Sequence, residues 1–139
     1  MLPDAPAPTT ILEAALYVDD LDRAEAFYGD LIGLEKVQRI GNRHLFYRVG
    51  SGMLLLFNAR ETVNPPSNPR FPVPPHGSHG PGHFCFAQSR TDQDLMKARL
   101  IAAAVEIEAE FDWPNGARSL YFRDPAGNSI EIAEPHLWT

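Results

Sequence analysis

The stretch Tyr121–Glu134, YFRDPAGNSIEIAE, predicts a strand, a tight turn and a second strand. The DPAG run in its middle contains the residues that four-residue turns favour, so we interpret that run as purely structural. Side chains two apart in a strand share a face, so Ile130 and Ile132 point one way and Glu131 points the other. On a solvated face Glu131 would be an ordinary surface residue. In a closed cavity it would need a cation or a proton, because burying an unpaired carboxylate is unfavourable.

The composition is that of an ordinary folded protein. With 139 residues the chain is long enough for one domain, or for two small subdomains that share a core. Hydrophobic residues make up 44% and charged residues 22%, and the formal net charge is -6. The basic residues are scattered along the chain, which argues against binding to nucleic acid. We therefore expect a small-molecule or protein partner.

The single cysteine, Cys85, excludes an internal disulfide and a cysteine-based zinc cluster. We expect it to pack as a small apolar residue. The opening MLPDAPAPTT has neither the basic start nor the apolar run of a signal peptide, and no segment approaches the ~18 apolar residues of a membrane span. We expect a cytoplasmic protein that does not bind membranes.

The pattern of strands and helices occurs twice. Apolar spacing predicts a strand at 11–18, a helix at 19–33 capped by Asp19 or Asp20, and strands at 34–40, 43–49 and 53–58. A second set follows, with a strand at 83–88, a helix from Thr91 as cap to 104, and strands at 105–111, 117–123 and 128–134. A repeat of about 60 residues indicates a duplicated module whose copies pack together. The expected fold is α+β, with two βαβββ modules forming curled sheets around a shared cup and helices on the outside.

The segment 59–82 separates the two halves. It contains seven of the thirteen prolines, and we expect no regular element in it. A long ordered loop in a compact domain usually covers a site or connects subdomains. His76 and His79 in this loop are interpreted as a flexible lid edge able to reach a substrate. The chain is thus one domain, 1–139, with modules at about 11–58 and 83–134.

Three potential metal ligands share one orientation. Glu13 and His83 lie at comparable places in the first strand of each half, on the face away from the helix, and Glu131 has the same orientation in the last strand. Two carboxylates and one imidazole suit Mn²⁺, Fe²⁺, Ni²⁺ or Zn²⁺, and three ligands leave positions open for water and substrate. The spacing between them carries no local signature, so surface roles for all three residues remain open at this point.

Three stretches together resemble the vicinal oxygen chelate superfamily, which includes glyoxalase I, extradiol dioxygenases and bleomycin-resistance proteins. They are EAALYVDDLDRAEAFYGDLIGLE, GHFCFAQ and YFRDPAGNSIEIAE, and the resemblance extends from Ile11 to Glu134. It implies a divalent metal held by Glu13, His83 and Glu131. The chain departs from the family at position 13, where His is commoner. The fourth ligand of glyoxalase I falls on Leu54 or Leu55.

The resemblance implies an enzyme that uses a divalent metal to polarise a small oxygen-bearing substrate, in a reaction of the lyase, isomerase, dioxygenase or transferase type. Glu131 and Glu13 are then the catalytic carboxylates, one of them able to act as a base. The alternative is a metal-free binding protein, like the bleomycin-resistance proteins, that sequesters a drug or an aromatic metabolite. A third possibility is a structural unit whose cup is filled with side chains. Because members of the family often dimerise, we expect a homodimer. The expected substrate-binding residues are Tyr17, His79, Trp113, Arg118 and Tyr121.

Overall fold

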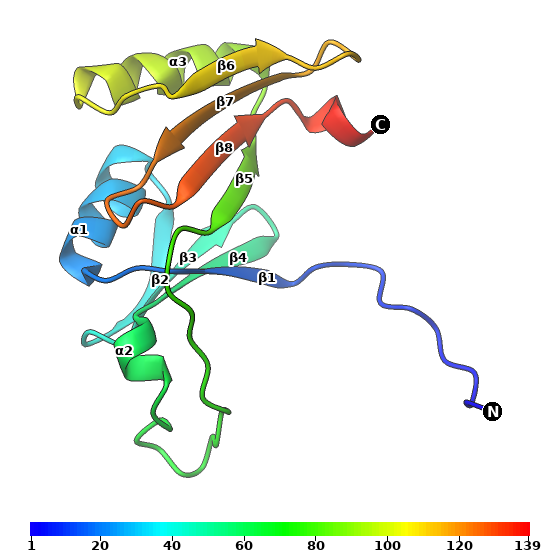
Figure 1. Cartoon of the computed structure of the whole chain (residues 1–139), viewed down its shortest axis with the longest axis vertical. Helices are drawn as coiled ribbons and strands as arrows, with labels where there is room; N and C mark the ends of the chain where they lie inside the picture. Colours follow the sequence, from blue (N-terminus) through cyan, green and yellow to red (C-terminus); the bar gives the residue numbers. More distant parts are fainter.

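The computed structural model describes all 139 residues and contains two four-stranded mixed sheets (Figure 1). The strand order is β1-β4-β3-β2 in the first sheet and β5-β8-β7-β6 in the second. In each sheet the first and last strands of the module are parallel neighbours, and the other pairs are antiparallel. The prediction of two βαβββ modules is confirmed. The elements, in chain order, are β1 (Glu13–Tyr17), α1 (Leu21–Glu25), the π-helical turn η1 (Ala26–Leu31), β2 (Glu35–Ile40), β3 (His44–Val49), β4 (Gly52–Phe57), α2 (Ala59–Thr62), β5 (His83–Ala87), α3 (Arg90–Ala102), β6 (Ala109–Asp112), β7 (Arg118–Arg123), β8 (Ser129–Ala133) and the 3₁₀ turn η2 (Pro135–Trp138).

The helices begin at side chains that accept a backbone N–H. Asp20 accepts the N–H of Arg23 at 3.1 Å and caps α1, as predicted. For α3 the predicted cap, Thr91, is wrong. Ser89 accepts the N–H of Asp92 at 3.2 Å, so the helix begins at Arg90 and Thr91 already lies within its first turn.

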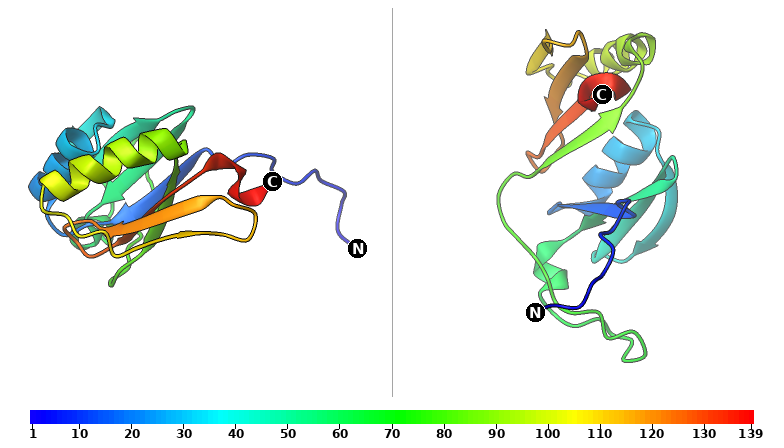
Figure 2. Two further views of the ribbon diagram at one scale, coloured as in Figure 1. Left: turned by 90° about the horizontal axis from the view of Figure 1, so that it is seen from above. Right: turned by 90° about the vertical axis from the view of Figure 1, so that its right-hand side faces the viewer.

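One hydrophobic core connects the two modules. The α1–η1 segment lies between the two sheets (Figures 1 and 2). The ring centroid of Phe27 lies 6.0 Å from that of Phe122 in β7. The Tyr28 hydroxyl donates to Asp124 Oδ2 at 2.7 Å, and Asp124 also accepts the N–H groups of Ala126 and Asn128. The DPAG turn therefore docks the second module onto the helical segment of the first, which confirms its structural interpretation.

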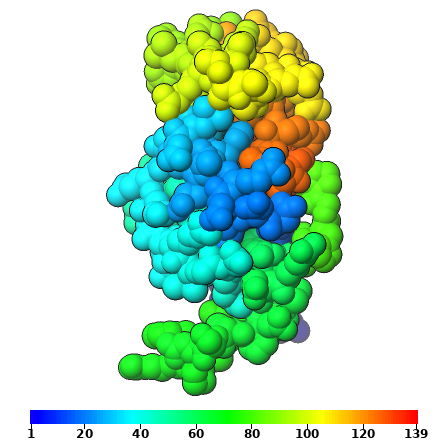
Figure 3. Space-filling model, turned by 90° about the vertical axis from the view of Figure 1, so that its left-hand side faces the viewer, coloured from blue at the N-terminus to red at the C-terminus, as the bar shows by residue number.

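The proline-rich segment between the modules contains one short helix that the sequence analysis missed. Asn58 caps α2 by accepting the N–H of Arg60, and the first proline comes only at Pro65. The four residues of α2 are therefore free to form a helical turn, and the expectation that 59–82 holds no regular element is wrong there. Residues 63–82 contain no helix or strand, and the middle of this segment projects from the body of the molecule before the chain returns to β5 (Figures 1 and 3).

The two ends of the chain differ. Residues 1–12 are exposed and extend away from the sheets (Figures 1 and 2). At the other end η2 turns back toward the loop between β6 and β7, where the Asn115 side chain donates to the carbonyl groups of His136 and Leu137 at 3.0 and 3.1 Å. None of the helices has the length and apolar character that crossing a membrane requires.

Candidate functional site

Glu131 is a buried carboxylate on the face of the second sheet opposite the core. Its neighbours Ile130 and Ile132 are part of the core, at 0% and 1% exposed. Glu131 points to the other face but is only 6% exposed, because side chains of β5 and β7 surround it. The ordinary surface role is therefore excluded. We call this side of the sheet the site face. It carries His83, Cys85, Ser119, Tyr121 and Glu131.

The two oxygens of Glu131 have different partners. The Ser119 hydroxyl donates to Oε2 at 2.5 Å, and His83 Nε2 lies 3.3 Å from Oε1. Ser119 is completely buried, whereas the His83 side chain is 52% exposed. One carboxylate oxygen is thus held inside the sheet face, and the other is directed toward an imidazole that solvent can reach.

The imidazole of His83 has a defined orientation. Its Nδ1 lies 3.0 Å from the carbonyl oxygen of Ser129, and a carbonyl oxygen only accepts, so Nδ1 carries a proton. In the neutral ring Nε2 then presents a lone pair to Glu131 Oε1, which is also an acceptor. Two acceptors at this separation repel each other unless a proton or a metal cation lies between them. The pair is therefore a site for a proton or a cation.

The donor atoms of this pair fit a divalent metal ion. Bonds of about 2.0 to 2.2 Å at tetrahedral or octahedral angles put neighbouring ligand atoms roughly 2.8 to 3.6 Å apart. The observed 3.3 Å between His83 Nε2 and Glu131 Oε1 lies in that range. Imidazoles that bind metals usually donate their other N–H to a carbonyl or a carboxylate, as His83 does to Ser129.

The structure brings together two of the three predicted ligands. Glu13 lies in β1 of the other sheet, where it is exposed. Within the chain, no group of three His, Cys, Asp or Glu side chains is arranged to hold a metal ion. His83 and Glu131 are therefore the part of the predicted metal site that a single chain assembles.

Two further groups beside Glu131 keep their protons at neutral pH. Burial, and then the hydrogen bond to Glu131, raise the pKa of Tyr121 to about 12. Cys85 is exposed and is not packed as the sequence analysis expected. Partial desolvation, and then the negative charge of Glu131, still raise the pKa of its thiol to about 12. Cys85 is therefore a neutral thiol and lacks the thiolate character of a nucleophile. Tyr121 offers a neutral hydroxyl next to the carboxylate.

A cavity of about 400 Å³ opens beside Glu131. Trp113, Tyr121 and Trp138 contribute aromatic rings to its lining, and ring contacts extend from Trp113 and Tyr121 to Phe111 and His83, which lie outside the lining. The ring centroid of Phe111 lies 4.8 Å from that of Trp113 and 5.8 Å from that of Tyr121, which in turn lies 6.3 Å from that of His83. Glu131 is the only charged residue that lines the cavity. The other lining residues are Trp113, Pro114, Asn115, Tyr121, Leu137 and Trp138.

The family model of the Glyoxalase/Bleomycin resistance protein/Dioxygenase superfamily matches residues 10–132. The chain belongs to this superfamily. Among solved structures it is similar to the lactoylglutathione lyase from Agrobacterium tumefaciens, with 46% identity and a TM-score of 0.87, over 95% of this chain and 98% of that one.

Other solved structures share the fold at lower identity. A glyoxalase/bleomycin resistance protein/dioxygenase from Nocardioides has 22% identity and a TM-score of 0.69, over 94% of this chain and 85% of that one. TioX from Micromonospora sp. ML1 has 24% identity and a TM-score of 0.68, over 91% and 98%. At these identities the likeness shows the fold alone. A search of curated proteins found no match.

The strand register shows which leucine of the first module corresponds to Glu131 of the second. In the parallel pair of the second sheet Glu131 lies opposite Cys85, and in the first sheet Leu55 lies opposite Ala15 at the same register position. Leu54 belongs to the core on the opposite face. Leu55 therefore takes the place of a fourth ligand, and the first module lacks that carboxylate.

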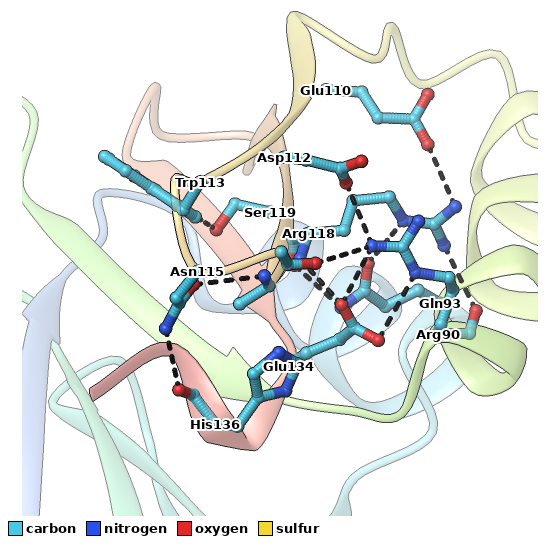
Figure 4. Close-up of polar contacts among 12 residues, drawn as sticks. Arg90, Gln93, Glu110, Asp112, Trp113, Asn115, Arg118, Ser119, Glu134 and His136 are labelled. Carbon is cyan, nitrogen blue, oxygen red and sulfur yellow. Dashed lines mark hydrogen bonds and ion pairs between the residues drawn. The ribbon is translucent and has the colours of Figure 1, made fainter. Parts of the chain in front are cut away.

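Arg118 does not line the cavity. It precedes Ser119 in β7, and adjacent strand residues point to opposite faces. Its guanidinium donates to Gln93 Oε1 at 3.0 Å and to Asp94 Oδ1 at 2.7 Å, both on α3 (Figure 4). The residue therefore packs the helix against the back of the sheet, and its expected place at the cup mouth does not agree with this geometry.

Two other predicted substrate residues lie at a different place. Tyr17 and His79 line a second cavity, of about 260 Å³, together with Asp19 and Arg60. The Tyr17 hydroxyl lies 2.7 Å from Nδ1 of His76, which belongs to the loop between the modules. Of the five predicted substrate residues, the structure places Trp113 and Tyr121 beside Glu131.

Sequence reasoning missed three residues of the site. Ser119 belongs to no motif, and a strand serine has no signature that distinguishes a buried hydrogen-bond donor from a surface hydroxyl. Leu137 and Trp138 line the cavity through η2. The one available signal for them was an apolar pair shortly after a proline at the end of the last strand.

Proposed function

We propose that the protein is a glyoxalase-type enzyme that uses a divalent metal ion bound through His83 Nε2 and Glu131 Oε1. One observation carries this proposal: His83 Nε2 and Glu131 Oε1 face each other at 3.3 Å, and the other imidazole nitrogen is held by the Ser129 carbonyl. A bound ion would act as a Lewis acid toward an oxygen of a small substrate. The likeness to a lactoylglutathione lyase favours a lyase reaction and makes lactoylglutathione the first substrate to test.

The chain's own residues position the substrate and move its proton. The rings of Trp113 and Tyr121 exclude water from one side of the cavity, which strengthens the electrostatic interactions inside it. Tyr121 keeps its proton at neutral pH and can donate a hydrogen bond to a substrate oxygen that develops negative charge. Glu131 is the only carboxylate that lines the cavity, so we assign it the role of general base, which its Oε1 would take when it is not bound to the ion.

The decisive experiment is metal binding by the purified, chelator-treated protein, measured by calorimetry with Mn²⁺, Fe²⁺, Ni²⁺ and Zn²⁺, together with turnover of lactoylglutathione. We expect one ion per chain, and a loss of affinity of more than about 100-fold in Glu131→Gln and in His83→Ala, beyond the loss expected for an outer partner. Glu106→Gln, an exposed carboxylate far from the cavity lining, should bind like the wild type. A wild-type protein that binds none of the four ions would contradict the proposal.

We further propose that the protein is a homodimer in which Glu13 of a second copy completes the metal site. Glu13 is exposed and takes part in no ion pair within its own chain, and the His83 ring is open to solvent. Both groups are therefore free to meet a residue from another chain. A third ligand from a second copy would still leave positions open for a substrate.

A subunit-mixing experiment tests this arrangement. Glu13→Ala and His83→Ala are expressed separately, and each should bind metal weakly. If ligands come from two copies, the mixed dimer contains one intact site, so refolding the two variants together should restore up to a quarter of the wild-type metal content. Assembly of the site within one chain predicts no recovery. Sedimentation of the wild type as a monomer would also refute the dimer.

The second candidate function is metal-free binding of an aromatic drug or metabolite. The observation that favours it is the set of three aromatic residues that line the cavity, Trp113, Tyr121 and Trp138. Both tryptophans of the chain line this cavity, so their fluorescence reports on its occupancy. Strong quenching by an aromatic ligand in a protein that binds no metal would support this function over the enzyme.

A further inference from the structure

We propose that Ser119, held by Trp113, is a positioning residue that fixes which oxygen of Glu131 faces His83. The inference rests on the proposed function, because it takes Glu131 as a metal ligand. No comparison assigns a role to Ser119 or to the indole N–H of Trp113.

The three side chains form a continuous chain of hydrogen bonds. Trp113 Nε1 lies 2.8 Å from Ser119 Oγ, and Ser119 Oγ lies 2.5 Å from Glu131 Oε2. Figure 4 shows the first of these contacts, at the start of β7. Ser119 is 0% exposed and Glu131 6%, so water does not compete for these bonds.

The donor and acceptor properties of the three groups fix the direction of the two hydrogen bonds. An indole N–H only donates, so Trp113 must donate to Ser119 Oγ. Ser119 has a single hydroxyl proton, and its contact with Trp113 uses an oxygen lone pair. The proton is therefore left for Glu131 Oε2, which accepts it as a carboxylate in a short, charge-assisted bond.

This bond restricts the rotation of the carboxylate. The terminal torsion of a glutamate is intrinsically broad, so the backbone alone does not decide which oxygen faces which partner. With Oε2 held by Ser119, Oε1 is directed to His83 Nε2. Without the hydroxyl, Oε2 would lose this buried donor, and the carboxylate would be free to turn toward its other donor, the Tyr121 hydroxyl.

The indole is itself fixed by the loop between β6 and β7. The backbone N–H of Trp113 donates to the Ala117 carbonyl at 2.8 Å, and the N–H of Gly116 donates to the Trp113 carbonyl at 2.8 Å. Gly116 has a φ of +86°, a conformation that favours glycine, so the tight turn depends on it. Trp113 thus serves two purposes: its ring forms part of the cavity wall, and its N–H orients Ser119.

The test compares metal affinity and the absorption spectrum of the Co²⁺-loaded protein in the wild type, Ser119→Ala and Trp113→Phe. We expect Ser119→Ala to weaken metal binding by about 10- to 100-fold, the range for loss of an outer partner, and to change the Co²⁺ spectrum. Trp113→Phe keeps the apolar ring and removes only the N–H, so we expect a smaller change in the same direction. Ser51→Ala, in an exposed turn, is the matched control.

The outcomes separate the two proposals. A wild type that binds metal, with unchanged affinity and Co²⁺ spectrum in both variants, overturns the positioning role and leaves the metal site standing. A wild type that binds no metal overturns both. Thermal unfolding checks that each variant folds. If Ser119→Ala does not fold, Trp113→Phe decides, since Trp113 is only partly buried and its replacement leaves Ser119 in place.

Discussion

The two sheets of the molecule have the same topology and register but different side chains on the face away from the core. Glu131 in the second sheet and Leu55 in the first occupy matching positions and are almost equally buried, at 6% and 8% exposed. Their neighbours on the adjacent strand are Tyr121 and Phe46, respectively. At these two positions the first module thus carries an apolar residue of similar shape in place of a polar one. The duplication provides the scaffold twice, but it provides the carboxylate once.

The first strands of the modules differ in a complementary way. His83 meets a carboxylate of its own sheet, whereas Glu13 lies opposite Met53 and has no ion-pair partner. A metal site shared between two copies would require a potential ligand without partners in one module and an incomplete pair of ligands in the other. The two modules have these features. The difference between the modules is therefore the physical basis of the proposed dimeric metal site.

The largest expected effect comes from exchanging the two matched residues. Leu55→Glu would bury a carboxylate beside Phe46 without a donor, so we expect it to lower the free energy of unfolding by about 2 to 4 kcal/mol. Glu131→Leu removes a buried charge, and replacing buried charges by apolar groups is often neutral or stabilising, so stability should stay within about 1.5 kcal/mol of wild type. Urea denaturation measures both.

The control for this exchange is Leu55→Met, which conserves volume and should change stability by less than about 1.5 kcal/mol. The comparison between the sheets fails if Leu55→Glu is as stable as Leu55→Met, because the face of the first sheet would then be solvated. Metal binding should be lost in Glu131→Leu and retained in Leu55→Met.

Two buried tyrosines of the first module differ in the partners of their hydroxyl groups, so their replacement by phenylalanine should change stability by different, smaller amounts. The Tyr28 hydroxyl donates to Asp124 of the second module at 2.7 Å, whereas the Tyr47 hydroxyl is buried without a partner. Tyr28→Phe should therefore destabilise the protein by about 1.5 to 3 kcal/mol, the range for a bond to a charged group. Tyr47→Phe should leave stability unchanged or raise it by up to about 1 kcal/mol. Equal losses in thermal unfolding would show that Tyr28 does not couple the modules.

Local pattern predicted much of this fold and the orientation of two residues of the proposed metal site. The alternation of Ile130, Glu131 and Ile132 predicts the orientation of the carboxylate, because in a strand this depends on the backbone alone. The common first-strand position of His83 predicts that the imidazole reaches the same face. These inferences need only strand geometry and the register of one sheet.

Tertiary packing decided the rest. Glu13 and His83 belong to different sheets, and no local spacing encodes how those sheets dock through contacts such as Phe27 against Phe122. The place of Trp138 depends on two hydrogen bonds from Asn115 to the end of the chain. Arg118 is a different case, because strand alternation alone decides its orientation. It lies three residues before Tyr121 in the same strand, so the two side chains point to opposite faces, and the expectation that both lie at the cup mouth was wrong on local grounds.

The most direct test of the metal site is anomalous diffraction from crystals of the protein grown with Zn²⁺ or Mn²⁺. The proposed function predicts one strong peak per chain at about 2.0 to 2.2 Å from both His83 Nε2 and Glu131 Oε1, with Glu13 of a second copy as a further ligand. No peak is expected beside Leu55. A map without a peak at His83 and Glu131, from crystals whose solution contains the ion at saturating concentration, would contradict the account.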